Sequence, residues 1–300
     1  MRFCHSHAAF RPADLTDKDG KLHGDVSRPI EKPIDDDSRD LTIEEANLFM
    51  TILGMGGWLS NTGRPDISYA QSRIAQHMKK PTMNALRAVL HMFAYLKTHK
   101  RLCLGAHRYH IQVAGPPVQD DLFTHYSDSD HAGNKEIQNK RRSQNGHISL
   151  VNGAPVVWHS KVSSIAFACV EMSGSHTSTS SAEAEIYAAS NAVNSVLQSS
   201  YIAEEMGLKL KRPMYMQIDN QSALAFAADT CERSNLKHID VRQYWVEELR
   251  DRGVCIPTYV PTKSNLADLF TKILGIPDFE CLRSQLMHVL PSECRFPSKE

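Results

Sequence analysis

Residues 121–128, Asp-Leu-Phe-Thr-His-Tyr-Ser-Asp, decide how the second half of this chain folds. The run at 122–127 is rich in apolar and aromatic side chains and is typical of a strand. It ends at the carboxylate of Asp128, and carboxylates rarely lie beside buried elements without a partner or a metal ion. The segment therefore predicts a strand that carries a functional acid.

Three further acids occupy comparable positions. Glu183 opens a long amphipathic stretch, Asp219 ends the strand-like run 214–218, and Asp268 lies in the helix-like segment 265–270. If these elements converge, the four side chains form an oxygen-only site suited to Mg²⁺ or Mn²⁺. Two ions about 3.5–4 Å apart can activate a water and neutralise the leaving oxygen of a phosphodiester. The pattern predicts a metal-dependent nuclease, and no cysteine, serine or histidine nucleophile arrangement competes with it.

The order of the elements predicts the fold class. Strand-like runs at 122–127, 146–151 and 155–158 precede a helix at 181–206, a strand at 215–218, a short helix from 221, a helix at 238–252 and a strand at 255–260. The dipeptide Asn152-Gly153 is a hairpin signal. Antiparallel strands followed by strands that alternate with helices predict an α/β fold, with a mixed sheet covered by helices.

The first part of the chain has a different character. Residues 1–40 are rich in charged residues and proline, which favours a linker or a disordered arm. Residues 41–98 show helical periodicity, with Pro65 and Pro81 at first-turn positions of two helices. The run 115–117, Gly-Pro-Pro, marks a domain boundary.

Composition limits the function classes. The 300 residues carry 34 Lys plus Arg and 34 Asp plus Glu, so nucleic-acid binding must come from a local patch and not from net charge. The 7 cysteines are scattered and never form C-x-x-C, which favours reduced intracellular thiols over disulfides or a zinc site. No secretory signal or span of about 20 apolar residues is present, so we expect a cytoplasmic or nuclear protein that is neither secreted nor in a membrane.

The segments that carry these acids resemble the ribonuclease H domain of Copia-type LTR retrotransposon Pol polyproteins. The similar segments are Tyr126-Ser-Asp-Ser-Asp-His-Ala-Gly, Lys140-Arg-Arg-Ser-Gln-Asn-Gly, Ser180-Ser-Ala-Glu-Ala-Glu-Ile-Tyr-Ala, Asp219-Asn-Gln-Ser-Ala-Leu, Leu236-Lys-His-Ile-Asp-Val-Arg and Tyr259-Val-Pro-Thr-Lys-Ser-Asn-Leu-Ala-Asp-Leu-Phe-Thr-Lys. Upstream, Gly63-Arg-Pro-Asp-Ile-Ser-Tyr-Ala and the helix that ends Ala94-Tyr-Leu-Lys-Thr also match. The resemblance covers residues 42–275 and includes no Y-x-D-D polymerase motif.

The resemblance implies a ribonuclease H-like mixed five-stranded sheet flanked by helices, preceded by a small helical subdomain. It divides the chain into an arm (1–40), a helical remnant of the reverse transcriptase thumb or connection (41–115), the ribonuclease H-like domain (116–275) and a C-terminal tail (276–300). The implied activity is hydrolysis of the RNA strand of RNA–DNA hybrids with two Mg²⁺ ions, or Mn²⁺. The implied partners are the hybrid and the rest of a Pol polyprotein or reverse transcriptase.

The resemblance also assigns residues. Asp128, Glu183, Asp219 and Asp268 are the expected catalytic metal ligands. Asp130 shares the strand face of Asp128 and is expected next to the metal ligands without binding the metal itself. Glu185 points away from Glu183 on a helix and is expected at the surface or as a cap. Independently of the resemblance, the locally basic stretch that holds Lys140, Arg141 and Arg142 predicts nucleic-acid contacts, with a solvated hairpin as the alternative. Nucleic-acid contacts are also expected from Asn220, Gln221, Ser222, Lys237 and His238, with helix capping as the alternative for Asn220, Ser222 and His238.

Three departures from the family pattern leave an alternative open. Ala182 and His131 replace the usual Thr and Trp, and the segment 161–183 is longer than usual. Displacing a catalytic group by about 1 Å can cost roughly a hundredfold in rate. The alternative is a catalytically impaired nucleic-acid-binding or assembly module, or a decaying retroelement fragment.

Overall fold

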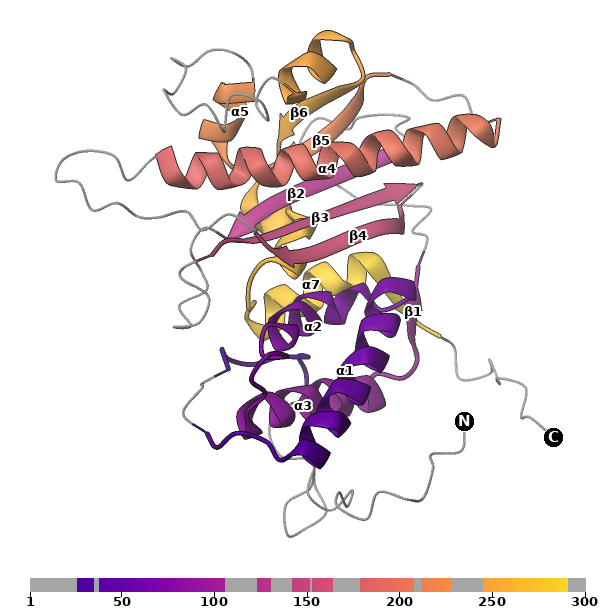
Figure 1. Cartoon of the computed structure of the whole chain (residues 1–300). Coiled ribbons are helices and arrows are strands. Elements are labelled where there is room, and N and C mark those ends of the chain that lie inside the picture. Colours follow the sequence, from indigo (N-terminus) through magenta and orange to yellow (C-terminus); the bar gives the residue numbers. More distant parts are fainter. Residues whose placement is uncertain are drawn as a thin grey trace, which may run out of the picture.

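The computed structural model describes residues 26–34, 38–105, 123–130, 142–151, 153–163, 179–207, 212–227 and 245–290. In these ranges, no helix combines the length and the apolar character that crossing a membrane requires. The elements fall into a sheet with helices on both of its faces (Figure 1).

A five-stranded mixed sheet forms the centre of the molecule, in the order β4-β3-β2-β5-β6. The strands are β2 (Phe123–Asp130), β3 (Gln144–Val151), β4 (Ala154–Val162), β5 (Met214–Ile218) and β6 (Cys255–Tyr259). The β2–β3 and β3–β4 pairs are antiparallel, whereas β2–β5 and β5–β6 are parallel. This arrangement confirms the predicted ribonuclease H-like fold class, a mixed five-stranded sheet flanked by helices.

One face of the sheet packs on α4 (Thr179–Glu205), which lies alongside β2 in Figure 1. Alanine and valine side chains of α4 contact the inward side chains of β2 and β5 in one buried cluster. The cluster also includes α5 (Gln221–Ala227) and helical residues at 245–251, the described part of the helix predicted at 238–252. Burial of this apolar surface fixes α4, and with it the acids near its N-terminus, against β2.

The opposite face packs on a helical unit made of α1 (Ile43–Thr62), η2 (Pro65–Ile67), α2 (Ser68–Ala75) and α3 (Met83–Thr98). Thr42 and Glu45 form a capping box at the start of α1. Buried side chains of the unit share one core with Tyr126, Ile148 and Leu150 of the sheet. The indole of Trp158 on β4 donates a 2.6 Å hydrogen bond to the carbonyl of Ser60 on α1. The helical unit and the sheet are thus packed together, not merely linked.

The C-terminal segment returns to the helical unit. Residues predicted as a tail form α7 (Ile276–Leu286) and β7 (Met287–Val289), and β7 pairs antiparallel with β1 (Leu102–Leu104). Part of the predicted N-terminal arm is also packed: Ile30 and Ile34 are buried, and Arg28 donates to the carbonyl of Leu274 at 2.6 Å. Both segments lie on the same side of the sheet as the helical unit (Figure 1). The domain boundaries given above stay predictions.

Several element boundaries differ from those predicted. Strands β2 and β4 are longer than expected because their ends pair with β3 over its full length. Pro65 holds a first-turn position as predicted, but in a 3-10 helix, whereas Pro81 precedes Thr82, which is the N-cap of α3. In the predicted hairpin, Gly153 has φ 77°, a conformation that favours glycine.

Candidate metal centre

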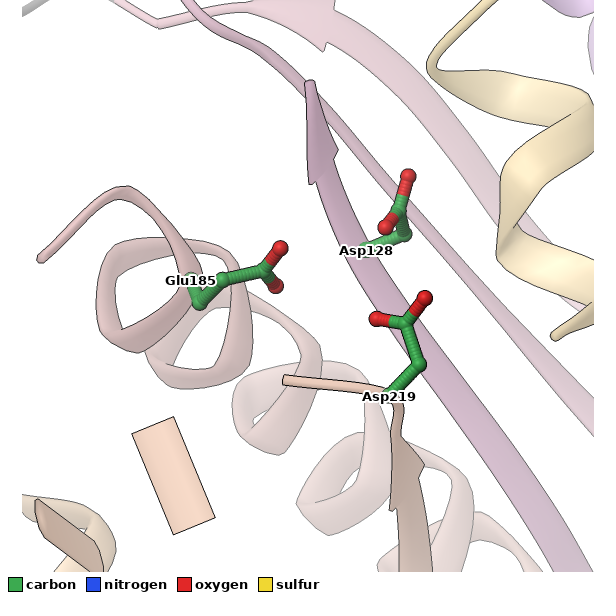
Figure 2. A group of neighbouring side chains, drawn as sticks. All are labelled: Asp128, Glu185 and Asp219. Carbon is green, nitrogen blue, oxygen red and sulfur yellow. The ribbon is translucent and has the colours of Figure 1, made fainter. Parts of the chain in front are cut away.

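Three carboxylates from three separate elements converge at one edge of the sheet. Asp128 lies on β2, Glu185 on α4, and Asp219 directly after β5. One ligand oxygen of each lies within 4.8 Å of the other two. Figure 2 shows the three side chains pointing toward one another. Because β2 and β5 are parallel neighbours, the ends of both strands reach the same edge, and this places Asp128 beside Asp219.

Asp128 is held by the segment that follows β6. Its side chain is buried, and the hydroxyl of Thr271 donates a hydrogen bond to its Oδ2. Residue 146, opposite Asp128 on β3, is glycine, and a Cβ there would lie 2.6 Å from Cβ of Phe270 and 2.7 Å from Cγ2 of Thr271. Gly146 therefore allows the 266–271 segment to reach Asp128.

Glu185 is the acid that the sequence analysis misplaced. It was expected at the surface or as a helix cap, but it is 5% exposed and is part of the carboxylate cluster. Burial, and then the charges of Asp128 and Asp219, raise the pKa of Glu185 well above its usual range. Glu183 was the predicted ligand; its backbone lies in α4, and its side chain is outside the described residues. The cluster found in the structure contains Glu185 in the place where we expected Glu183.

The sequence did contain a signal for Glu185. Residues at i, i+4, i+7 and i+11 share one face of a helix. Counted from Glu185, these positions are Ala189, Ala192 and Val196, which are all buried against the sheet. Counted from Glu183, they are Tyr187, Ser190 and Asn194, which are more polar. The position of the buried stripe on the helix therefore identifies Glu185 as the acid that faces the sheet, whereas the motif comparison pointed to Glu183.

Asp268 lies next to the cluster but is held by a lysine. It belongs to η5 (Leu266–Phe270), a 3-10 helix whose N-cap, Asn265, accepts from the backbone N–H of Ala267 and donates to the carbonyl of Ser127. Nζ of Lys272 lies 2.8 Å from Oδ1 of Asp268 and 3.8 Å from Oδ2 of Asp128. Burial, with the charge of Asp128 next, raises the pKa of Asp268 to about 8. Lys272 counters part of this repulsion.

The other predicted residues have mixed outcomes. Asp130 is at the end of β2, and burial raises its pKa. The side chain of Asn220 accepts a 3.0 Å hydrogen bond from the backbone N–H of Ala223. Asn220 therefore caps α5, which was the alternative interpretation for this residue. Gln221 is exposed and Arg142 is half-buried. Lys140, Arg141, Lys237, His238 and the side chain of Ser222 lie outside the described residues.

A groove with polar and apolar lining residues lies between α4 and strands β3 and β4. Its lining includes Asn145, Lys161, Tyr187, Asn191 and Ser195. Asn145 accepts a 2.9 Å hydrogen bond from the hydroxyl of Ser129, which neighbours Asp128 in β2. The groove therefore offers amide, hydroxyl and ammonium groups, and Asn145 links its lining to the strand that carries Asp128.

The donor set fits a divalent cation. Carboxylate oxygens are the ligands that Mg²⁺ and Mn²⁺ prefer. Oε2 of Glu185 is buried and has no hydrogen-bond partner among the described residues. Burial raises the pKa of Asp128 as well, with smaller contributions from Asp219 and Asp130. A buried group of negative charges with an oxygen left without a donor is the arrangement that a cation stabilises.

Curated relatives match most of this chain. It is 28% identical over 219 residues to the retrovirus-related Pol polyprotein from transposon TNT 1-94 of Nicotiana tabacum, a match that covers 72% of this chain and 14% of that protein. It is 30% identical over 243 residues to the corresponding polyprotein from transposon RE1 of Arabidopsis thaliana, a match that covers 78% of this chain and 14% of that protein. Its homologues are Copia-type Pol polyproteins. A match of 25% to the truncated transposon Ty1-A Gag-Pol polyprotein of Saccharomyces cerevisiae covers 82% of this Pol homologue and 19% of that protein.

This Pol homologue thus spans less than a fifth of the length of these relatives. No protein-family model matches it. Among solved structures, ribonuclease H1 from Halobacterium salinarum NRC-1 is 16% identical with a TM-score of 0.34, and covers 50% of this chain and 93% of that chain. LC11-RNase H1 in complex with an RNA/DNA hybrid is 12% identical with a TM-score of 0.34 and the same coverage. The fold assignment rests on the strand order and directions of the sheet.

Proposed function

We propose that this chain is a retrotransposon-derived ribonuclease H-like endonuclease that hydrolyses the RNA strand of RNA–DNA hybrids. The observation that carries the proposal is the convergence of Asp128, Glu185 and Asp219 at the edge of a ribonuclease H-like sheet. The homologous Pol polyproteins and the groove between α4 and strands β3 and β4 support it.

In this proposal the three carboxylates hold the cation, and the elements behind them fix their positions. A divalent ion bound there would neutralise charge on the scissile phosphate and lower the pKa of a bound water. Asp128 is oriented by Thr271, and Glu185 is fixed by the packing of α4 on the sheet. Asn220 caps α5 immediately after Asp219 and so anchors the turn that carries this acid.

The two-ion mechanism that the resemblance implies needs a further ligand, and Asp268 is the predicted one. Its carboxylate is paired with Lys272, so a second ion has to compete with this ammonium. Asp130 stays a candidate for orienting groups around the site. The groove residues, with Arg142 and Gln221, are the candidates for contacts to the hybrid.

Cleavage of a hybrid that carries a labelled RNA strand tests this function. We expect cleavage in Mg²⁺ that is lost on chelation, and no cleavage of the same RNA when it is single-stranded. The variant Asp219→Asn should bind the hybrid but leave it intact. Hybrid binding by the wild-type chain without cleavage, in both Mg²⁺ and Mn²⁺, would contradict the proposal and favour a non-catalytic nucleic-acid-binding module.

A further inference from the structure

Lys272 has a position that the proposed function leaves unexplained. Its ammonium lies between two buried carboxylates, 2.8 Å from Oδ1 of Asp268 and 3.8 Å from Oδ2 of Asp128. Asp128 is also a member of the three-carboxylate cluster. The acids therefore form two groups that share Asp128. The first group is Asp128, Glu185 and Asp219. The second is Asp128 and Asp268, and it already contacts the positive charge of Lys272.

This position is built into the fold. Asp268 and Lys272 are four residues apart, and the backbone N–H of Lys272 donates to the carbonyl of Asp268. Asn265 ties the start of this segment to β2, and the absence of a side chain at Gly146 allows the segment to lie against β3. The backbone of Lys272 is thus fixed, and its side chain places the ammonium group between Asp128 and Asp268.

A lysine ammonium can occupy the position of a metal ion between two carboxylates, and its side chain can also move away from them. It is a compact charge with three donors on a flexible stem, so it can bridge two carboxylates without fixed ligand geometry. The side chain of Lys272 is 33% exposed, whereas those of Asp128 and Asp268 are 4% and 7% exposed. A divalent ion at the same place would therefore have to displace Lys272 toward solvent.

We propose that Lys272 is a resident cation of this site, which occupies the second ion position between Asp128 and Asp268. The chain without nucleic acid then binds a single divalent ion, on Asp128, Glu185 and Asp219. The inference rests on the proposed function only in assuming that these three acids bind an ion. A merely structural ion pair would have no effect on the number of ions bound.

Counting bound Mn²⁺ on the full chain, without nucleic acid, tests this inference. The free Mn²⁺ signal in electron paramagnetic resonance gives the stoichiometry directly. We expect one tightly bound ion in the wild type, two in Lys272→Met, and one again in Lys272→Met combined with Asp268→Asn. Lys272→Arg keeps the charge and should bind one. Lys263→Met removes an exposed lysine of the 3-10 helix Thr262–Ser264 and serves as the control, again with one ion.

Asp268→Asn alone tests the same point without changing the lysine. An ordinary two-ion site would fall from two bound ions to one, whereas a site with a resident lysine stays at one. Two ions of similar affinity in the wild type, or one ion in a folded Lys272→Met, would overturn the inference and leave the proposed function standing. No bound ion in the wild type would overturn both. Circular dichroism confirms the fold of each variant.

Discussion

At the residue scale, the site depends on which glutamate of α4 faces the sheet. Glu183 and Glu185 are two positions apart, so on a helix they point in very different directions. Glu185 continues the buried stripe of Ala189, Ala192 and Val196 and reaches Asp128 and Asp219. The two glutamates should therefore differ sharply in their contribution to metal binding and activity.

Glu185→Gln should lower Mn²⁺ affinity and hybrid cleavage by more than about 100-fold, because losing even a group that only supports a metal ligand costs about 10–100-fold. Glu183→Gln is the matched control in the same turn, and we expect it to stay within about threefold of wild type. Both effects are measured by Mn²⁺ titration and single-turnover cleavage. Equal losses in the two variants would contradict the assignment of Glu185.

Thr271 tests how strongly Asp128 depends on its neighbour. The change Thr271→Val keeps the shape of the side chain and removes the hydrogen bond to Asp128. We expect a loss of about 10–100-fold in metal affinity, as is usual when a group that orients a metal ligand is removed. Thr271→Ser, which keeps the hydroxyl, should restore most of it. A valine variant with wild-type affinity would show that Thr271 does not orient the acid.

At the element scale, the segment 265–272 brings Asp268 and Lys272 to β2. Its position depends on a glycine in β3 and on an asparagine cap that is completely buried. Both are effects of close packing between segments far apart in the sequence. From the sequence, Asp268 was expected on an ordered element, and its i,i+4 spacing from Lys272 is a signal for an ion pair that was not used. The approach of Lys272 to Asp128 was not predictable, because it depends on the packing of this segment against β2.

Gly146→Ala should destabilise the protein and weaken the site, since the new Cβ would collide with Phe270 and Thr271. Overpacking of this kind costs about 1–3 kcal/mol in unfolding free energy. Gly54→Ala is the control, because a Cβ at this helical glycine meets nothing within 4 Å. Urea unfolding of both variants measures the difference in unfolding free energy. A Gly146→Ala variant as stable as wild type would argue against close packing of the segment 265–272 on β3.

The fold itself was largely predictable at this scale. Strand-like runs ending at Asp128 and Asp219, separated by a long helix, predict a mixed sheet with both acids at one edge, and the structure has this arrangement. The role of 276–289 was not predictable, because a strand as short as β7 has no periodicity of its own and forms only by pairing with β1. The burial of Ile30 and Ile34 likewise depends on distant partners.

At the scale of the whole molecule, two histidines in the face of the sheet that packs on α4 link stability to pH. Burial lowers the pKa of His125 to about 4 and that of His147 to about 3. Nε2 of His147 lies 2.9 Å from the hydroxyl of Ser195 on α4. An unfolded histidine titrates near pH 6.5, so between these values the unfolded state binds more protons than the native state.

The histidine contribution to stability should therefore be fully present above about pH 6.5 and decline as the pH falls toward about 4. The variant His147→Gln removes one of these protonation sites. We expect the loss of unfolding free energy between pH 7.5 and pH 5 to be smaller in this variant than in the wild type, measured by urea unfolding with the ion concentration held constant. An unchanged or larger loss would contradict burial of a neutral His147.

The central claim is that Asp128, at the junction of β2, α4 and β5, is required for hydrolysis of the RNA strand. Single-turnover cleavage of a labelled RNA–DNA hybrid in Mg²⁺ by the wild type and by Asp128→Asn tests it most directly. Asp251→Asn, at a carboxylate whose side chain is 67% exposed, is the control. We predict that Asp128→Asn folds, binds the hybrid and does not cleave it, while Asp251→Asn cleaves at the wild-type rate. Cleavage by Asp128→Asn at the wild-type rate would contradict the account.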